Sequence, residues 1–422
     1  SEDDQIRFCD RDNFESLLRI QRTRQRPLVE PKPQSALSPF LAAWQGFGSK
    51  AGDDALHDAL ISLRGYPASA QLWLTDLWHA RFTDFSDHQL EHAFDTAELI
   101  WYGTGREQFA LGYPEDIELL TETEEPAALA ELFHDPGARY GFLQLADKQS
   151  QGIESFNDDF WRAVWRSEIY CDSLPALRQG SLARYQLSAR PPRSRSSRRS
   201  RRSAGRLGSG WPGNWLLADR GDETFDPLTE LEDNKERARL LLDRYGLLCR
   251  ELANREGGLA RWAAIARALF AMELAGEVVA GYFFSGLSGP QFMTPAGVQR
   301  FQRRPASLNY WLNATDPASP CGLGDSDPRL PARRVQNLLS YHAGELALTV
   351  ENSGRRLCFH VPAEHPELDE ICQPLLHLAR QRRSISVDTI NDEAVSQSPY
   401  LAVLSRILTP RRDHRQIHFE VR

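Results

Sequence analysis

Residues 259–295, LARWAAIARALFAMELAGEVVAGYFFSGLSGPQFMTP, decide the fold. Gly276 ends a helical stretch, and two strands joined by Ser-Gly-Leu-Ser-Gly follow it. Upstream, 231–244 predicts an amphipathic helix that stops at Gly246, and about 248–254 predicts a short second helix. Three helices followed by a β-hairpin are the winged-helix arrangement. The third helix carries its apolar stripe on Leu259, Trp262, Ile265, Ala266, Leu269, Phe270 and Leu274.

The same order of elements occurs twice more toward the N-terminus. The copy at 54–112 places its hairpin turn at Gly103-Thr104-Gly105. A less regular copy at 126–176 has its third helix at about 157–167. The chain therefore predicts three tandem winged helices.

The third helix of the less regular copy carries two kinds of side chain. Trp161 and Trp165 share one face, and Arg162 and Arg166 share another. Arginine on such a helix is a candidate contact for DNA phosphates. A solvated charged face is the alternative interpretation.

Charge is segregated along the chain. The formal net charge is −8. The Arg/Ser tract 193–206, RSRSSRRSRRSAGR, contributes +7, so the remainder carries −15. A tract so poor in apolar residues cannot pack a core. We expect it to contact nucleic acid; a contact with an acidic partner and a solubilising linker are the alternatives. Its candidate phosphate-binding residues are Arg193, Arg195, Arg198, Arg199, Arg201 and Arg202.

From about residue 305 the pattern changes to successive strands, including 335–343, 345–353 and 355–361. A helix over about 366–382 and another over 396–408 follow, and the chain closes with the strand QIHFEV. We expect a compact α+β unit with a curved or barrel-like sheet.

The last strand alternates polar and apolar residues. One face is therefore wet or lies in a cleft, where a carboxylate near a histidine can activate water. An exposed terminal edge strand is the other interpretation, and it is the one that we favour. The polar face holds His414, Gln416, His418 and Glu420, with Asp413 just ahead of it.

Motifs for other chemistry are weak. The chain lacks GxxxxGK[ST], so it has no P-loop. His88 and His92 with Glu91 match HxxEH, a zinc pattern. We favour a solvated third helix of a winged helix over a zinc site, because no third ligand is defined. We expect no metal and no cofactor.

Three further features of the sequence concern the cellular compartment. No run of about 18 apolar residues predicts a membrane span. The chain starts at Ser1 without a signal region, which indicates a piece of a longer protein. Six cysteines occur without a CxxC pair, which favours a reducing, cytoplasmic compartment.

Several stretches resemble the C-terminal region of the bacterial large helicase-related (Lhr) proteins. They are LHDALISLRGYPASAQLWLTDLWHARFTDFSDHQLEHAFDTAELIWYG at 56–103, FWRAVWRSEIYCDSLPALR at 160–178, ERARLLLDRYGLLCREL at 236–252 and LNATDPASPCGLG at 312–324. The resemblance covers nearly the whole chain. It implies an ATP-dependent superfamily 2 DNA helicase core ahead of this region and a tandem winged-helix array with a β-barrel. It also implies uracil-DNA glycosylase activity and a tendency to oligomerise.

The same region is similar to AlkZ-type DNA glycosylases, which use a Gln-apolar-Gln motif. The corresponding stretch here is Ala43-Trp44-Gln45-Gly46, which keeps one glutamine. The resemblance further implies a catalytic carboxylate near the C-terminus. Asp413 and Glu420 are its two options, and Gln45 is the next candidate.

Together these observations predict an α+β protein of tandem winged-helix domains with a C-terminal β-barrel-like unit. Two functions stay open: a DNA-repair module that excises uracil, and a non-catalytic DNA-binding and oligomerisation scaffold. Expected partners are single-stranded or forked DNA, the helicase core of the same protein and further copies of the chain, in the cytoplasm and without a membrane. The predicted segments are 1–45 (N-terminal segment and Pro-rich connector), 46–125 and 126–190 (winged helices), 191–225 (Arg-rich linker), 226–304 (winged helix) and 305–422 (C-terminal domain).

Overall fold

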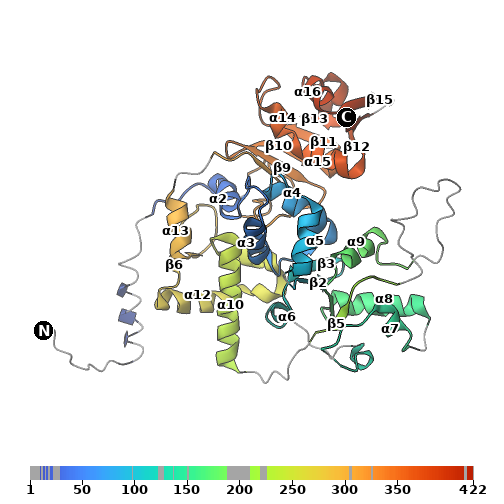
Figure 1. Ribbon diagram of the computed structural model, residues 1–422. Helices are drawn as coiled ribbons and strands as arrows, with labels where there is room; N and C mark the ends of the chain where they lie inside the picture. Colours follow the sequence, from blue (N-terminus) through green and yellow to red (C-terminus); the bar gives the residue numbers. More distant parts are fainter. Residues whose placement is uncertain are drawn as a thin grey trace. The chain divides into compact units, whose positions relative to one another are not determined.

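The computed structural model (Figure 1) describes most of the chain. It divides into two compact units. Unit 1 comprises 1–45, 225–309 and 317–422, and unit 2 comprises 46–224 and 310–316. No helix among the described residues is long and apolar enough to cross a bilayer. The described residues are 10, 13–14, 16–17, 20–21, 29–96, 98–121, 128–135, 137–149, 152–187, 210–218, 226–303, 307–324, 327–412 and 416–421.

Unit 2 begins with a winged helix, as the copy at 54–112 predicts. Its hairpin, the wing, consists of β2 (Ile100–Gly105) and β3 (Gln108–Gly112), and β1 (Ala68–Ser69) pairs with β3. A π-helical turn continues into α4, so these two form one helix. The helices are α3 (Asp53–Leu63), the π-helical turn Leu72–Asp76 with α4 (Leu77–Arg81), and α5 (Asp87–Thr96).

The sheet of this winged helix continues into the next part of unit 2. Its strand order is β1-β3-β2-β4-β5. The buried face of α8 packs aromatic rings into the core; Trp161 stacks on Trp101 with ring centroids 6.2 Å apart, and Trp215 meets it edge-on. The added elements are α6 (Pro114–Leu120), α7 (Phe142–Ala146), α8 (Ile153–Trp165), β4 (Ile169–Cys171), α9 (Leu174–Leu182) and β5 (Trp215–Leu217).

A distant segment, Tyr310–Asp316, completes unit 2. Its strand β8 (Tyr310–Asn313) packs on α4. The amide of Asn313 donates a hydrogen bond to the Asp76 carboxylate at 2.8 Å, and both side chains are buried. Unit 2 is therefore assembled from two pieces of the chain.

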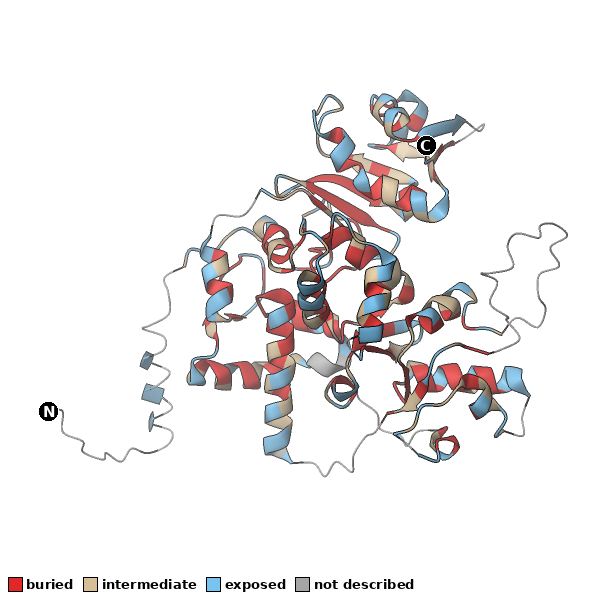
Figure 2. Cartoon of the chain, viewed as in Figure 1, coloured by how far each residue is buried: buried red, intermediate tan, exposed pale blue. Residues whose placement is uncertain are grey.

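Unit 1 contains the winged helix predicted over 229–295. The left-handed residue Gly246 ends the first helix, and a Cβ there would lie 2.5 Å from the Trp44 ring, so only glycine fits. Figure 2 shows the first and third helices, α10 and α12, buried along one side. Phe270 departs from the predicted buried stripe: it is 47% exposed. The elements are α10 (Pro227–Tyr245), α11 (Arg250–Ala253), α12 (Trp262–Ala275), β6 (Val279–Gly281) and β7 (Gln291–Met293).

The C-terminal part of unit 1 contains two sheets. Five strands follow the order β14-β13-β11-β10-β9, and three follow β12-β16-β15. The described strands do not close into a barrel, so the barrel-like arrangement stays a prediction. The strands are β9 (Leu338–His342), β10 (Glu345–Glu351), β11 (Arg356–Phe359), β12 (Ser384–Val387), β13 (Thr389–Ile390), β14 (Glu393–Ala394), β15 (Thr409–Arg412) and β16 (Ile417–Glu420).

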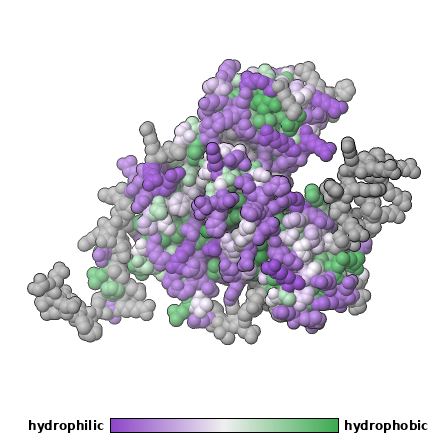
Figure 3. Space-filling view, viewed as in Figure 1, coloured by the Kyte–Doolittle hydropathy of each residue, from purple (hydrophilic) through white to green (hydrophobic). Residues whose placement is uncertain are grey.

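The remaining helices of unit 1 are short. The helix predicted at 366–382 is divided at Cys372 into two. Residues visible in Figure 3 are mainly hydrophilic, with hydrophobic ones in small separate areas. These helices are α2 (Leu37–Trp44), α13 (Pro295–Gln302), α14 (Leu368–Ile371), α15 (Gln373–Arg382) and α16 (Leu401–Ile407).

Candidate nucleic-acid interface

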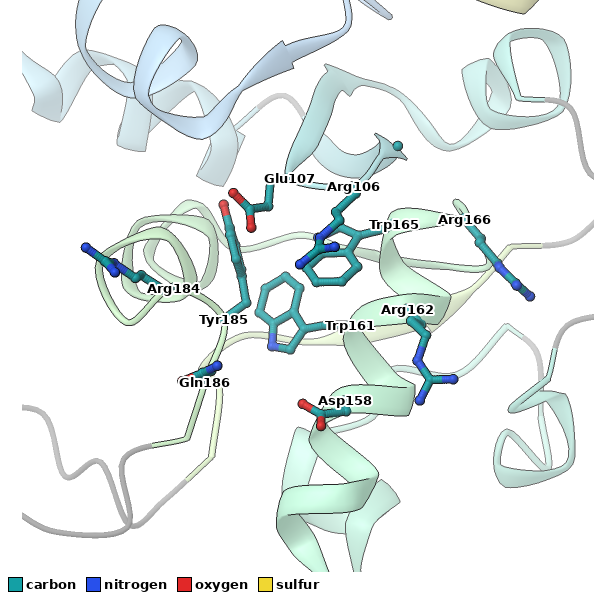
Figure 4. A pocket seen from close by; sticks show the side chains of 11 residues that line it. Arg106, Glu107, Asp158, Trp161, Arg162, Trp165, Arg166, Arg184, Tyr185 and Gln186 are labelled. Atoms are coloured by element: carbon teal, nitrogen blue, oxygen red, sulfur yellow. The ribbon is translucent and has the colours of Figure 1, made fainter.

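A pocket of about 760 Å³ opens in unit 2 between the wing, α8 and the chain that follows α9 (Figure 4). We call it the arginine–aromatic pocket. The wing reaches α8 because Gly103 has no side chain: a Cβ there would lie 2.2 Å from the Val164 carbonyl oxygen. The pocket is lined by Gly105, Arg106, Glu107, Asp158, Trp161, Arg162, Trp165, Arg166, Arg184, Tyr185 and Gln186.

Three aromatic rings form the inner wall of the pocket. Trp161 is almost fully buried, and the Tyr185 ring meets it edge-on at 4.8 Å. The half-buried Trp165 lies next to both, with centroid distances of 6.4 Å to Trp161 and 5.8 Å to Tyr185. The Arg106 guanidinium lies 5.9 Å from the centre of the Trp165 ring, a cation–π contact.

Four arginines and two carboxylates give the pocket lining a formal charge of +2. Arg162 is 64% exposed and pairs with Asp159 at 2.6 Å, and Arg166 is 56% exposed with Glu168 at 3.8 Å. Arg106 and Arg184 are exposed and form no salt bridge with another described residue. Exposed surface ion pairs are weak, so these guanidiniums remain available to an anion.

The backbone around the pocket is held in an unusual conformation. Glu107, Arg184 and Tyr185 have φ values of 58°, 52° and 59°, in the left-handed region that disfavours residues other than glycine. Ser167, directly after the pocket residue Arg166, has φ 61°. Each such residue costs of order 1 kcal/mol, and such strain concentrates at functional sites.

Two hydrogen-bond donors next to the pocket have no acceptor among the described residues. The indole nitrogens of Trp161 and Trp165 are buried without a hydrogen-bond partner among the described residues. Burial, reinforced by the Glu107 charge and opposed by a hydrogen bond from Ser181, raises the pKa of Tyr185 to about 12. Its hydroxyl therefore remains a donor at neutral pH.

The predicted phosphate contacts Arg162 and Arg166 thus lie in one pocket. Arg193, Arg195, Arg198, Arg199, Arg201 and Arg202 lie outside the described residues. The sequence reasoning missed Arg106 and Arg184, which come from other segments. The one available signal for Arg106 was its position just after the Gly103-Thr104-Gly105 turn.

The two predicted carboxylates near the C-terminus belong to a different part of the chain. Glu420 lies on β16, where its side chain is 46% exposed and 3.8 Å from Arg411. His418, on the same face, contacts the Ser386 hydroxyl at 2.8 Å. Ile417 and Phe419 are buried opposite, so the alternation predicted for this strand is confirmed. Asp413 and His414 lie outside the described residues.

The strand is not an edge strand, so the interpretation that we favour from the sequence is wrong. β16 pairs with β12 on one side and β15 on the other, so it is the central strand of its sheet. A central position fixes the backbone on both sides. The backbone that carries Glu420 is therefore held by a neighbouring strand on each side.

Gln45, the third predicted catalytic residue, is buried at the end of α2. Its amide donates a hydrogen bond to the Arg244 carbonyl at 2.9 Å. This carbonyl lies near the C-terminal end of α10, where carbonyls lack helical partners. The contact gives Gln45 a structural role in unit 1.

Two residues of the HxxEH pattern lie in contact. His88 Nδ1 is 3.4 Å from the Glu91 carboxylate, the His88 side chain is 92% exposed, and Glu91 also pairs with Arg178 at 2.6 Å. Over the described residues, no group of three or more His, Cys, Asp or Glu could hold a metal ion.

The chain is similar in sequence to known proteins. Residues 32–120 and 228–309 each match a model for a winged-helix domain of the large helicase-related protein. The chain is 28% identical over 393 residues to "Lhr helicase/probable uracil glycosylase" of Mycolicibacterium smegmatis, covering 83% of this chain and 25% of that protein. It is 26% identical over 423 residues to "Lhr helicase/uracil glycosylase" of Escherichia coli, covering 88% and 26%. The chain thus spans about a quarter of the length of these relatives.

The fold is also found among solved structures. The Streptomyces sahachiroi DNA glycosylase AlkZ superimposes with a TM-score of 0.51 and 13% identity, covering 83% of this chain and 97% of AlkZ. Two of the three predicted winged helices, at 54–112 and 229–295, are confirmed, and the copy at 126–176 stays a prediction. The predicted resemblance is also confirmed: the chain is similar to large helicase-related proteins over 83% to 88% of its length, carries two winged-helix domains of that protein and shares the fold of AlkZ.

Proposed function

We propose that this chain is a DNA-binding module of a DNA-repair protein and that it holds DNA at the arginine–aromatic pocket. The proposal rests on one observation. Four arginines from three segments of the chain line one pocket with an aromatic wall: Arg106, Arg162, Arg166 and Arg184. Guanidiniums fit phosphate oxygens, and aromatic rings stack on bases. The names of the two relatives support a DNA-acting role.

The reaction that we propose for this module is excision of uracil from DNA. The bond between C1′ of the deoxyribose and N1 of uracil breaks, and both bonding electrons leave with the base. A carboxylate stabilises the sugar cation and orients a water molecule, whose oxygen bonds to C1′ while its proton passes to the uracil. Glu420 is the described candidate for this carboxylate, Asp413 is the other, and Gln45 follows if neither serves.

Base release from uracil-containing single-stranded DNA, without ATP, tests the reaction. We expect release by the unmodified chain and a loss of about 10² or more in rate for either Glu420→Gln or Asp413→Asn, with DNA binding retained. Glu393→Gln, at an exposed carboxylate on β14, is the matched control and should excise normally. Full activity in both variants would place the carboxylate elsewhere.

The alternative is a non-catalytic DNA-binding and oligomerisation scaffold that serves a helicase core in the same protein, in the cytoplasm. DNA binding without any uracil release would favour it. Its partners would then be DNA, that core and further copies of the chain. Light scattering of the purified chain, which gives the mass in solution, tests self-association directly.

A further inference from the structure

The arginine–aromatic pocket contains both an aromatic wall and acidic groups, and this mixture restricts what it can hold. We infer that the pocket takes in one unstacked nucleotide of single-stranded DNA, with its base against the aromatic wall and its phosphates at the arginines of the rim. The inference rests on the proposed DNA binding. It adds that the chain binds a base, which phosphate contacts alone do not require.

The distribution of charge sets the orientation of the nucleotide. Glu107 and Asp158 line the same pocket as the arginines. A phosphate placed beside these carboxylates would meet like charge, whereas the N–H groups of a base can donate to them. In Figure 4, Arg162 and Arg166 lie on one side of the aromatic rings and Arg184 on the other. The phosphates on the two sides of a nucleotide can therefore each meet a guanidinium.

The aromatic wall supplies a surface for the base. Trp165 is half-buried, and its ring already carries the Arg106 guanidinium at 5.9 Å. A base has a π-face that can take the place of either partner in such a stack. Arg106 sits at the tip of the wing and is exposed, so it can move aside or cover the base from above.

The wall also offers a hydrogen-bond donor to a base. It is the hydroxyl of the lining residue Tyr185, and every base carries acceptors on its edge. The left-handed backbone of Arg184 and Tyr185 holds the rim and the wall together at one point. Bases within a duplex are stacked on both faces and paired at their Watson–Crick edges, so a base that lies against the aromatic wall comes from a single strand.

A pair of oligomers with equal charge separates base binding from phosphate binding. One is an oligothymidylate of about eight nucleotides, within the span that a single-strand binding fold covers. The other has the same length and the same phosphates but an abasic analogue at every position. We expect the unmodified chain to prefer the oligothymidylate by roughly 5- to 150-fold, the scale of one stacked base.

Variants at the wall then locate the effect. Trp165→Ala should reduce the preference to near unity and leave the salt dependence of binding unchanged, whereas Trp165→Phe, which keeps a ring, should retain most of it. A thermal unfolding curve shows whether Trp165→Ala is folded; if it is not, Arg106→Ala, at an exposed residue, replaces it and should weaken the preference several-fold. A preference that persists in the folded variant would overturn the inference.

Two results distinguish this inference from the proposed function. Equal binding of both oligomers by the unmodified chain would overturn the base-binding site and leave DNA binding intact. Failure to bind either oligomer would overturn both.

Discussion

The carboxylate of Asp316 accepts hydrogen bonds from both terminal nitrogens of the Arg81 guanidinium, at 2.7 and 3.0 Å, across a separation of 235 residues. Both side chains are almost fully buried. Arg81 ends α4, and Asp316 ends the segment that completes unit 2. The pair therefore fastens the distant segment to the winged helix of unit 2.

Asp316→Ala should destabilise the chain by about 3 to 5 kcal/mol, because it leaves the buried Arg81 charge without its partner. Denaturant unfolding followed by tryptophan fluorescence measures the change. Glu91→Gln is the matched control, since its pair with Arg178 is one-third exposed and should contribute at most about 1 kcal/mol. Similar losses in both variants would contradict this role for Asp316.

Replacing Arg162 and Arg166 together by serine should flatten the salt dependence of single-strand binding. Each phosphate contact contributes about 0.7 to the slope of log affinity against log salt concentration, so the slope should fall by roughly 1.4. Arg178→Ser, at an arginine engaged with Glu91, should leave the slope unchanged. An unaltered slope in the double variant would mean that these two residues form only a solvated face.

A separate prediction concerns the Arg/Ser tract. Serine at Arg198, Arg199, Arg201 and Arg202 should lower the slope by up to about 2.8 if each meets a phosphate. Titrations at several salt concentrations, run beside the Arg162 and Arg166 variant, give the slope. No change would identify the tract as a linker.

Gln45→Met should cost about 1 to 3 kcal/mol of stability, because the Arg244 carbonyl loses its buried donor. Uracil release, measured well below the unfolding temperature, should change by only a few-fold. The reverse result, normal stability with release lost, would make Gln45 a catalytic residue instead.

Metal analysis of the purified chain should find no stoichiometric zinc, since His88 is exposed and Glu91 is engaged with Arg178. His88→Ala should change the free energy of unfolding by no more than about 0.5 kcal/mol. Zinc that is present in the parent chain and absent from His88→Ala would contradict the prediction.

The elements that the sequence predicts well are those with a local pattern of residues. Helical periodicity with glycine stops located α10 and α12, and strict alternation assigned the faces of β16. The same reasoning failed for Phe270, because an apolar stripe does not reveal how much of its width a neighbour covers. It also missed the division at Cys372, although Pro374 just after it favours a helix start there.

Relations between distant segments could not be derived from such patterns. The central position of β16 depends on which strands pair beside it, and strand order is a property of the whole sheet. Part of the arginine–aromatic pocket could be predicted: Trp161, Arg162 and Trp165 lie on one helix, and Arg166 follows it directly. Arg106 and Arg184 join them only because Gly103 lets the wing approach α8 and because the chain turns back after α9.

The two-piece construction of unit 2 bears on how the protein is made. A ribosome releases residues 46–224 well before residues 310–316 emerge, and until then Arg81 has no Asp316 to meet. Unit 2 therefore stays incomplete, with the Arg81 charge unmatched, while the winged helix of unit 1 is synthesised. Such late, long-range closure slows folding and prolongs exposure to aggregation. A chain that ends at residue 224 would lack residues 310–316, so its unit 2 could never be completed.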